Sequence, residues 1–184
     1  MIKVLAIGGE PCSGKTTLVK RFIKESGLQF KKKRVNKLLD LLHDEENGVY
    51  ILGLYEDSIG TFQGTDKLSM AVQPDAVDFF NSIDSGTVIF EGDRLFNNKM
   101  LDYLSDKFGE RFKVLVLSAS DEVLEERHTS RNDNQDDKFK TSRKTKVNNI
   151  ITNLNLMDHI NVLKNNTEPE REIVYKFVKE FVAG

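Results

Sequence analysis

Cysteine and long apolar runs are nearly absent from this chain of 184 residues. The single cysteine, Cys12, cannot form an internal disulfide, which fits a reducing cytoplasm. No apolar segment is long enough to cross a bilayer, and the N-terminal apolar stretch is too short for a signal peptide. The three histidines lack metal-ligand spacing, so nothing supports a zinc site. We therefore expect a cytoplasmic protein with no membrane partner.

An excess of charge of either sign is also missing. The net charge is −2, with 30% charged and 39% hydrophobic residues. This balance gives no global reason to expect binding to nucleic acid or to a membrane surface. The composition is that of an ordinary globular chain, and its length predicts a single domain over residues 1–184.

Strand-like and helix-like segments alternate, which predicts an α/β fold with a parallel sheet covered by helices on both faces. The expected strands, apolar throughout as in buried sheets, span 2–7, 49–55, 87–91, 112–117 and 160–163. The expected helices span 15–26, 36–43, 75–83, 97–107, 120–130, 142–154 and 169–182. Polar stretches at 57–73 and 130–142 are expected to be loops on the ligand-binding side of the sheet.

The most specific motif is Gly9–Thr16 (GEPCSGKT), which fits the pattern G-x-x-x-x-G-K-[ST] between a strand and a helix. In this pattern, backbone N–H groups and the helix N-terminus face phosphate oxygens. Lys15 reaches the β/γ-phosphates, and Thr16 offers its hydroxyl to Mg²⁺. We predict an ATP site, because no guanine-specific motif is recognisable. The predicted nucleotide contacts in the loop are Gly9, Pro11, Cys12, Ser13, Gly14, Lys15, Thr16 and Thr17.

A second group of candidate residues ends the strand 87–91. An acidic side chain at a strand tip beside such a loop orients Mg²⁺ or its water shell, so we predict Thr16 and Glu91 for the metal. Asp93 and Arg94 would then face the phosphate acceptor. The alternative, that Glu91 caps a helix or pairs with Arg94, stays open at this point.

Transfer of a phosphoryl group to a hydroxyl needs a carboxylate that aligns the hydroxyl and takes its proton. The candidates for this base, in order of preference, are Asp57, Asp66 and Asp93. The stretch 60–73 around Asp66 suits a planar polar ligand, and an ordinary surface loop is an equally good interpretation.

With its size and the rhythm of its strands, the Gly9–Thr16 motif makes the chain resemble P-loop kinases of the nucleoside/nucleotide kinase group. The resemblance implies a three-layer P-loop NTPase fold, a five-stranded parallel sheet and a basic lid, here at about 128–145. Glu91 stands where the common form has Asp, as in uridine-kinase-like enzymes, which leaves open which acid serves the metal. The segments 53–57, 64–69 and 90–95 also look like a phage-associated branch, some members of which phosphorylate 5-hydroxymethyluracil in DNA.

The lid of such kinases supplies arginines that neutralise charge during transfer. Arg127 and Arg131 are the expected nucleotide-side pair, with Arg143 third, although a charged surface helix is the alternative for any one of them. In these kinases the turn before the last helix lies against the base, which implies nucleobase contacts for Asn166 and Thr167.

A basic flank from Lys20 to Lys37 contains eight basic residues and one acidic residue. It could follow the phosphate backbone of a nucleic acid, or it could be a solvated helix face.

The sequence thus predicts an ATP- and Mg²⁺-dependent phosphotransferase with a hydroxyl acceptor. The acceptor is either a hydroxymethylated pyrimidine in DNA or a free nucleoside, nucleotide or small metabolite. An ATP-hydrolysing switch or binding module is the alternative from another class, but the acids at 56–66 and 91–94 argue against it. The oligomeric state stays open.

Overall fold

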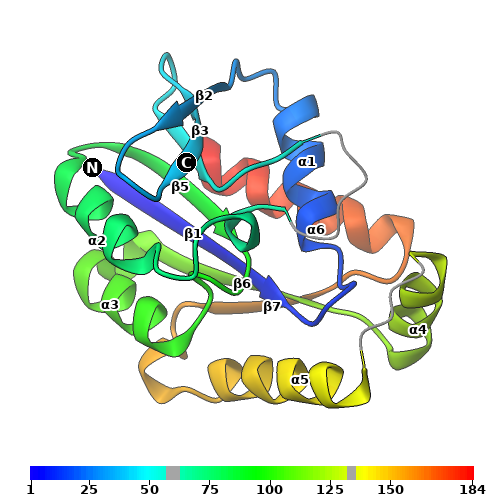
Figure 1. The fold of residues 1–184 in the computed structure, drawn as a ribbon. Coiled ribbons are helices and arrows are strands. Elements are labelled where there is room, and N and C mark those ends of the chain that lie inside the picture. The colour runs from blue at the N-terminus through cyan, green and yellow to red at the C-terminus, as the bar shows by residue number, and fades with distance from the viewer. Residues whose placement is uncertain (57–62, 132–135) are drawn as a thin grey trace.

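The computed structural model describes residues 1–56, 63–131 and 136–184. Seven strands form one sheet in the order β2-β3-β4-β5-β1-β6-β7 (Figure 1). The strands are β1 (Ile2–Gly9), β2 (Lys31–Arg34), β3 (Asp40–Asp44), β4 (Val49–Leu52), β5 (Gly86–Glu91), β6 (Phe112–Ser118) and β7 (Ile160–Lys164). The α-helices are α1 (Lys15–Glu25), α2 (Gln73–Ser82), α3 (Asn98–Phe108), α4 (Asp121–Ser130), α5 (Asp137–Ile151) and α6 (Glu168–Ala183). Short 3-10 turns lie at Thr65–Lys67, Gly109–Arg111 and Leu154–Leu156.

The five expected strands are all present, and they are neighbours in the parallel part of the sheet, β4-β5-β1-β6-β7. The expected total of five strands is wrong, because β2 and β3 extend the sheet at the β4 edge in antiparallel register. The fold is therefore an α/β fold with a mostly parallel, seven-stranded sheet flanked by helices.

The helix expected at 36–43 is wrong. Its second half, 40–43, belongs to β3, in which the four residues Leu41–Asp44 are buried, and its first half is neither helix nor strand. A short, leucine-rich apolar run does not distinguish a covered strand from a helix by its periodicity. The partner strand β2 was not expected, because Lys31–Arg34 are four consecutive exposed cations without an apolar face.

Two apolar clusters cover the two faces of the sheet. In β1, Val4 and Ala6 point to the cluster with α2, α3 and α5, whereas Leu5 and Ile7 point to the cluster with α1 and α6. Successive side chains of a strand face opposite sides, so one buried strand serves both layers. The helices lie on both sides of the sheet in Figure 1. The sheet is thereby fixed between two helical layers, and the carboxyl ends of β1 and β5 lie side by side.

Candidate functional site

The loop between β1 and α1 is curled into an unusual backbone conformation. Gly9, Cys12 and Gly14 have φ angles of 141°, 63° and 103°. The Lys15 ammonium folds back onto this loop and donates to the carbonyl oxygens of Gly9 and Glu10, both at 2.9 Å. Helix α1 begins after Gly14 with no side-chain cap and no acidic residue in its first turn. The positive end of its dipole therefore faces the loop without a side-chain partner.

Two side chains from other elements hold the loop from outside. Asn165, buried just after β7, donates its Nδ2 to the Ser13 carbonyl at 2.6 Å. Arg127 of α4 donates to the Cys12 carbonyl at 3.1 Å and to the Asn165 carbonyl at 2.6 Å. A Cβ on Gly14 would lie 2.4 Å from Asn165 Nδ2, so this position has no room for a side chain. Contacts within the protein therefore hold the loop in its curled form.

Glu91 is the last residue of β5 and lies beside Ile7 of β1 in the sheet. Its Oε1 accepts from the Thr16 hydroxyl at 3.0 Å, and its carbonyl accepts from the Thr65 hydroxyl at 2.8 Å. The carboxyl is buried, which raises the pKa of Glu91 to about 7 although Lys15 pulls it down. Burial likewise lowers the pKa of Lys15, and the charge of Glu91 opposes that change. Each of these two groups thus favours the charged form of the other, against the effect of burial.

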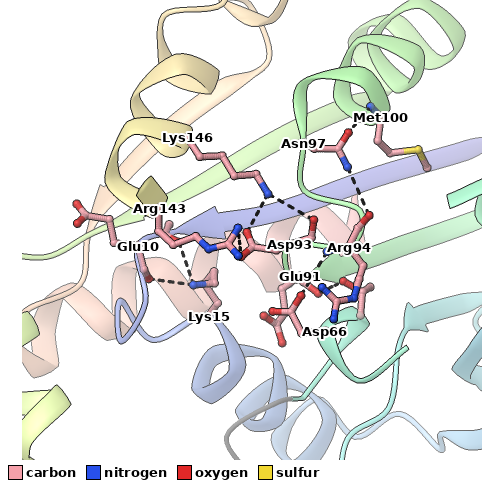
Figure 2. Close-up of polar contacts among 12 residues, drawn as sticks. Glu10, Lys15, Asp66, Glu91, Asp93, Arg94, Asn97, Met100, Arg143 and Lys146 are labelled. Atoms are coloured by element: carbon pink, nitrogen blue, oxygen red, sulfur yellow. Dashed lines mark hydrogen bonds and ion pairs between the residues drawn. The ribbon is translucent and has the colours of Figure 1, made fainter. Parts of the chain in front are cut away.

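Asp66 and Arg94 lie next to this pair (Figure 2). Asp66 Oδ1 accepts from the backbone N–H of Arg94 at 3.3 Å, and burial together with the charge of Asp93 raises the pKa of Asp66. The Nε atom of Arg94 is buried and has no hydrogen-bond partner among the described residues. Gly92, which follows Glu91, has a φ angle of 111°. A Cβ on Gly92 would lie 2.6 Å from the Thr65 hydroxyl oxygen, so the turn has no room for a side chain at this position.

Helix α5 sends two cations to the end of β5 (Figure 2). Arg143 Nη1 lies 2.9 Å from Asp93 Oδ2, and Lys146 Nζ lies 3.0 Å from Asp93 Oδ1. In the described part of the segment expected as a lid, 128–131 and 136–145, the chain forms the end of α4 and the first part of α5. A pocket opens beside the Gly9–Thr16 loop, lined by Glu10 and Pro11 together with residues of α4 and α5.

The structure gathers most of the predicted residues at the carboxyl edge of the sheet. Arg131 is exposed at the end of α4, with Nη1 3.8 Å from the Cys12 thiol, and Cys12 Sγ lies 3.4 Å from Nδ1 of His128. Thr17 is exposed in the first turn of α1. Asp57, the preferred base, lies outside the described residues.

The nucleobase contacts expected from the last turn have structural partners. Asn166 Oδ1 accepts from the Ser120 N–H at 2.8 Å, and Thr167 forms a capping box with Glu170 at the start of α6. The neighbouring Asn165, which reaches the loop, was not predicted. The only sequence signal for Asn165 was its position in the same polar turn as Asn166 and Thr167.

Comparisons with known proteins add little to this geometry. No protein-family description and no curated protein matches the chain. Among solved structures, the unliganded sugar kinase of a Janibacter species aligns at a TM-score of 0.48 and 14% identity, over 100% of this chain and 96% of that one. A match this distant carries no conclusion about activity.

Two kinds of feature are not found in the described residues. Over residues 1–56, 63–131 and 136–184, no helix is long and apolar enough to cross a membrane. Within the same ranges, no three or more His, Cys, Asp or Glu side chains are grouped to hold a metal ion.

Proposed function

We propose that the protein is an ATP- and Mg²⁺-dependent phosphotransferase of the P-loop type that acts on a hydroxyl acceptor. The observation that carries the proposal is the meeting of Lys15, Thr16 and Glu91 where the Gly9–Thr16 loop passes the end of β5. These are the cation, hydroxyl and carboxylate that such a reaction requires at one point.

The curled loop fits a polyphosphate. Left-handed residues such as Gly9, Cys12 and Gly14 are typical of backbone turns that form anion-binding nests. Ser13 is fully buried, yet its Oγ has no hydrogen-bond partner in the described part of the chain. A phosphate oxygen would give that hydroxyl a partner and would replace the two carbonyls that Lys15 now contacts. The loop therefore contains donors that a phosphate would satisfy.

The oxygen atoms of Thr16 and Glu91 fit Mg²⁺ better than zinc. Mg²⁺ is typically held by one or two carboxylates and by substrate phosphates, rather than by a full set of protein ligands. When bound, the ion neutralises charge that develops on the phosphate oxygens. Glu91 would face it ionised, since a nearby cation favours the charged carboxylate.

On the acceptor side, Asp66 is the best-placed base among the described residues. Its carboxyl makes no ion pair there, and its raised pKa makes it a stronger proton acceptor than an exposed aspartate. Asp93 is engaged by Arg143 and Lys146, so we assign it to holding α5. Asp57 remains a candidate.

The basic side chains of α4 and α5 would neutralise charge during transfer. Arg127 already touches the loop backbone, Arg131 lies near the Cys12 thiol, and Arg143 pairs with Asp93 just beyond β5. Their planar guanidinium groups suit phosphate oxygens, and helices packed over the loop would exclude water.

A nucleic-acid acceptor is favoured by one observation, the exposed strand Lys31–Arg34. Not every cation of the basic flank is available, because Lys20 donates to the Glu56 carbonyl and Arg21 pairs with Glu25 and Glu172. If this surface binds a phosphate backbone, affinity for DNA will fall steeply with salt. A free nucleoside, nucleotide or small metabolite acceptor predicts only a weak salt effect.

The test uses γ-labelled ATP with parallel panels of nucleosides, nucleotides and unmodified or hydroxymethylated DNA. We expect label in one panel, and loss of about 10²–10³-fold in Lys15→Ala, as for the loss of one transition-state donor. Lys176→Ala, an exposed lysine of α6, is the matched control. Turnover near wild type in Lys15→Ala would contradict the proposal, and ATP hydrolysis without any labelled acceptor would favour a switch.

A further inference from the structure

Tyr55 lies three residues beyond β4, with its ring in the apolar cluster that α1 and α6 form on the sheet. The residue is 8% exposed, and its ring packs in the same cluster as Leu18, Phe22 and Ile51. At the other end of the ring, the hydroxyl is buried and makes no well-aligned hydrogen bond with the described residues, although the Glu91 carboxylate lies within its reach. An unsatisfied buried hydroxyl costs about 1–3 kcal/mol, so a phenylalanine would be the cheaper residue for packing alone.

The hydroxyl faces the carboxylate of Glu91. A Cβ built on Gly64 would lie 2.4 Å from Glu91 Oε1 and 2.9 Å from the Tyr55 hydroxyl oxygen. Both oxygens therefore border the small space that Gly64, with φ 65°, leaves open. The charge of Glu91 adds to burial in raising the pKa of Tyr55, which agrees with this proximity. The tyrosine thus brings one donor near Glu91 Oε1, the oxygen that also accepts from the Thr16 hydroxyl.

Glu91 needs such a donor once its present partner is used elsewhere. Its carboxylate now receives a well-aligned hydrogen bond from Thr16, and this hydroxyl is the proposed ligand of the metal ion. The other hydroxyl on Glu91, that of Thr65, is bound to the backbone carbonyl and not to the carboxylate. Residues behind a metal ligand orient it, and their loss typically weakens metal binding about 10–100-fold.

We infer that Tyr55 is a positioning residue, whose hydroxyl orients the Glu91 carboxylate for the metal–nucleotide complex. The inference rests on the proposed function and adds to it a residue outside the Gly9–Thr16 loop.

The chain offers a matched control. Tyr175 of α6 belongs to the same apolar cluster, is 7% exposed and also has a buried hydroxyl without a partner in the described residues. Tyr175→Phe removes the same atom from the same cluster, and its ring packs under Arg21 rather than beside Glu91. A general effect of removing a buried hydroxyl will therefore appear in both variants.

The experiment is calorimetric titration with a non-hydrolysable ATP analogue, in EDTA and in excess Mg²⁺. The readout is the dissociation constant in EDTA divided by the dissociation constant in Mg²⁺. This ratio isolates the part of binding that depends on Mg²⁺. We expect this ratio to fall about 10-fold in Tyr55→Phe, with binding in EDTA unchanged, and to stay at the wild-type value in Tyr175→Phe. Thermal melting of both variants checks that each is folded.

Each other outcome contradicts the inference in its own way. An unchanged ratio in Tyr55→Phe, while Glu91→Gln loses the Mg²⁺ effect, rejects the role of Tyr55 and leaves the proposed function standing. An equal loss in EDTA and in Mg²⁺, or the same loss in Tyr175→Phe, assigns the effect to packing. A wild-type protein whose nucleotide binding does not respond to Mg²⁺ overturns both.

Discussion

Replacing Glu91 by glutamine should make the protein more stable at neutral pH while abolishing transfer. Glutamine keeps the shape of the side chain and the oxygen that accepts from Thr16, but it carries no charge. Burial raises the pKa of Glu91 from 4.5 to about 7. One pKa unit corresponds to about 1.4 kcal/mol, so ionising this carboxylate inside the protein costs the native state about 3 kcal/mol.

The sign follows from proton binding. The unfolded chain releases this proton near pH 4.5 and the native protein near pH 7, so the native state binds more protons between these values. The contribution of Glu91 to the free energy of unfolding therefore falls as pH rises through this window and is constant above it. Glutamine has no such dependence, and the difference between variant and wild type should grow from near zero to about 3 kcal/mol.

Urea denaturation at pH 5, 6, 7 and 8 without Mg²⁺ measures this difference directly. For a protein of this size, the change corresponds to a rise in Tm of about 10 °C at pH 8. Glu46→Gln, in the exposed turn between β3 and β4, is the control and should follow wild type at each pH. A Glu91→Gln stability that does not gain on wild type between pH 5 and pH 8 would refute the argument that Glu91 is strongly desolvated.

Two further substitutions test the surroundings of Glu91. Asp93→Asn should release α5, with faster amide exchange in that helix and a loss of about 1–2 kcal/mol at most, because the pairs with Arg143 and Lys146 are partly exposed; unchanged exchange would show that these pairs do not hold α5. Gly92→Ala should destabilise the protein by about 1–3 kcal/mol from its left-handed backbone alone, with the contact to the Thr65 hydroxyl adding to this, as urea denaturation would measure; a neutral effect would contradict the described turn.

The sequence predicted the parallel part of the sheet because each of those strands has a local sequence signal. Val88, Ile89 and Phe90 in β5 are continuously apolar, as strands covered on both faces must be. The added strands do not follow that rule. β2 consists of four exposed cations, and only its pairing with β3 makes it a strand. Pairing between distant backbones leaves no periodic mark on the sequence, so the antiparallel edge could not be predicted.

Some residues of the candidate site could be predicted from the sequence and others could not, for a similar reason. The Gly9–Thr16 loop could be predicted because its glycines and its lysine have fixed spacing, and Glu91 because it ends a buried strand. Asn165 and Tyr55 could not be predicted, because each acts through one contact across the fold. A single asparagine or tyrosine carries no spacing signal, and its partner is known only when the strands are placed.

Several destabilising features lie at this edge of the sheet, and they argue that the edge is a functional site. Burial works against the charge of both Lys15 and Glu91, and the hydroxyls of Ser13 and Tyr55 lack partners in the described chain. Each of these features is destabilising, and apolar or isosteric replacements exist for each. Buried polar atoms without a partner in the described residues also occur elsewhere, at His43 and Tyr175. Only around the point where β1 and β5 end do they meet a buried acid and a desolvated lysine, and a bound anion with its cation would satisfy this group together.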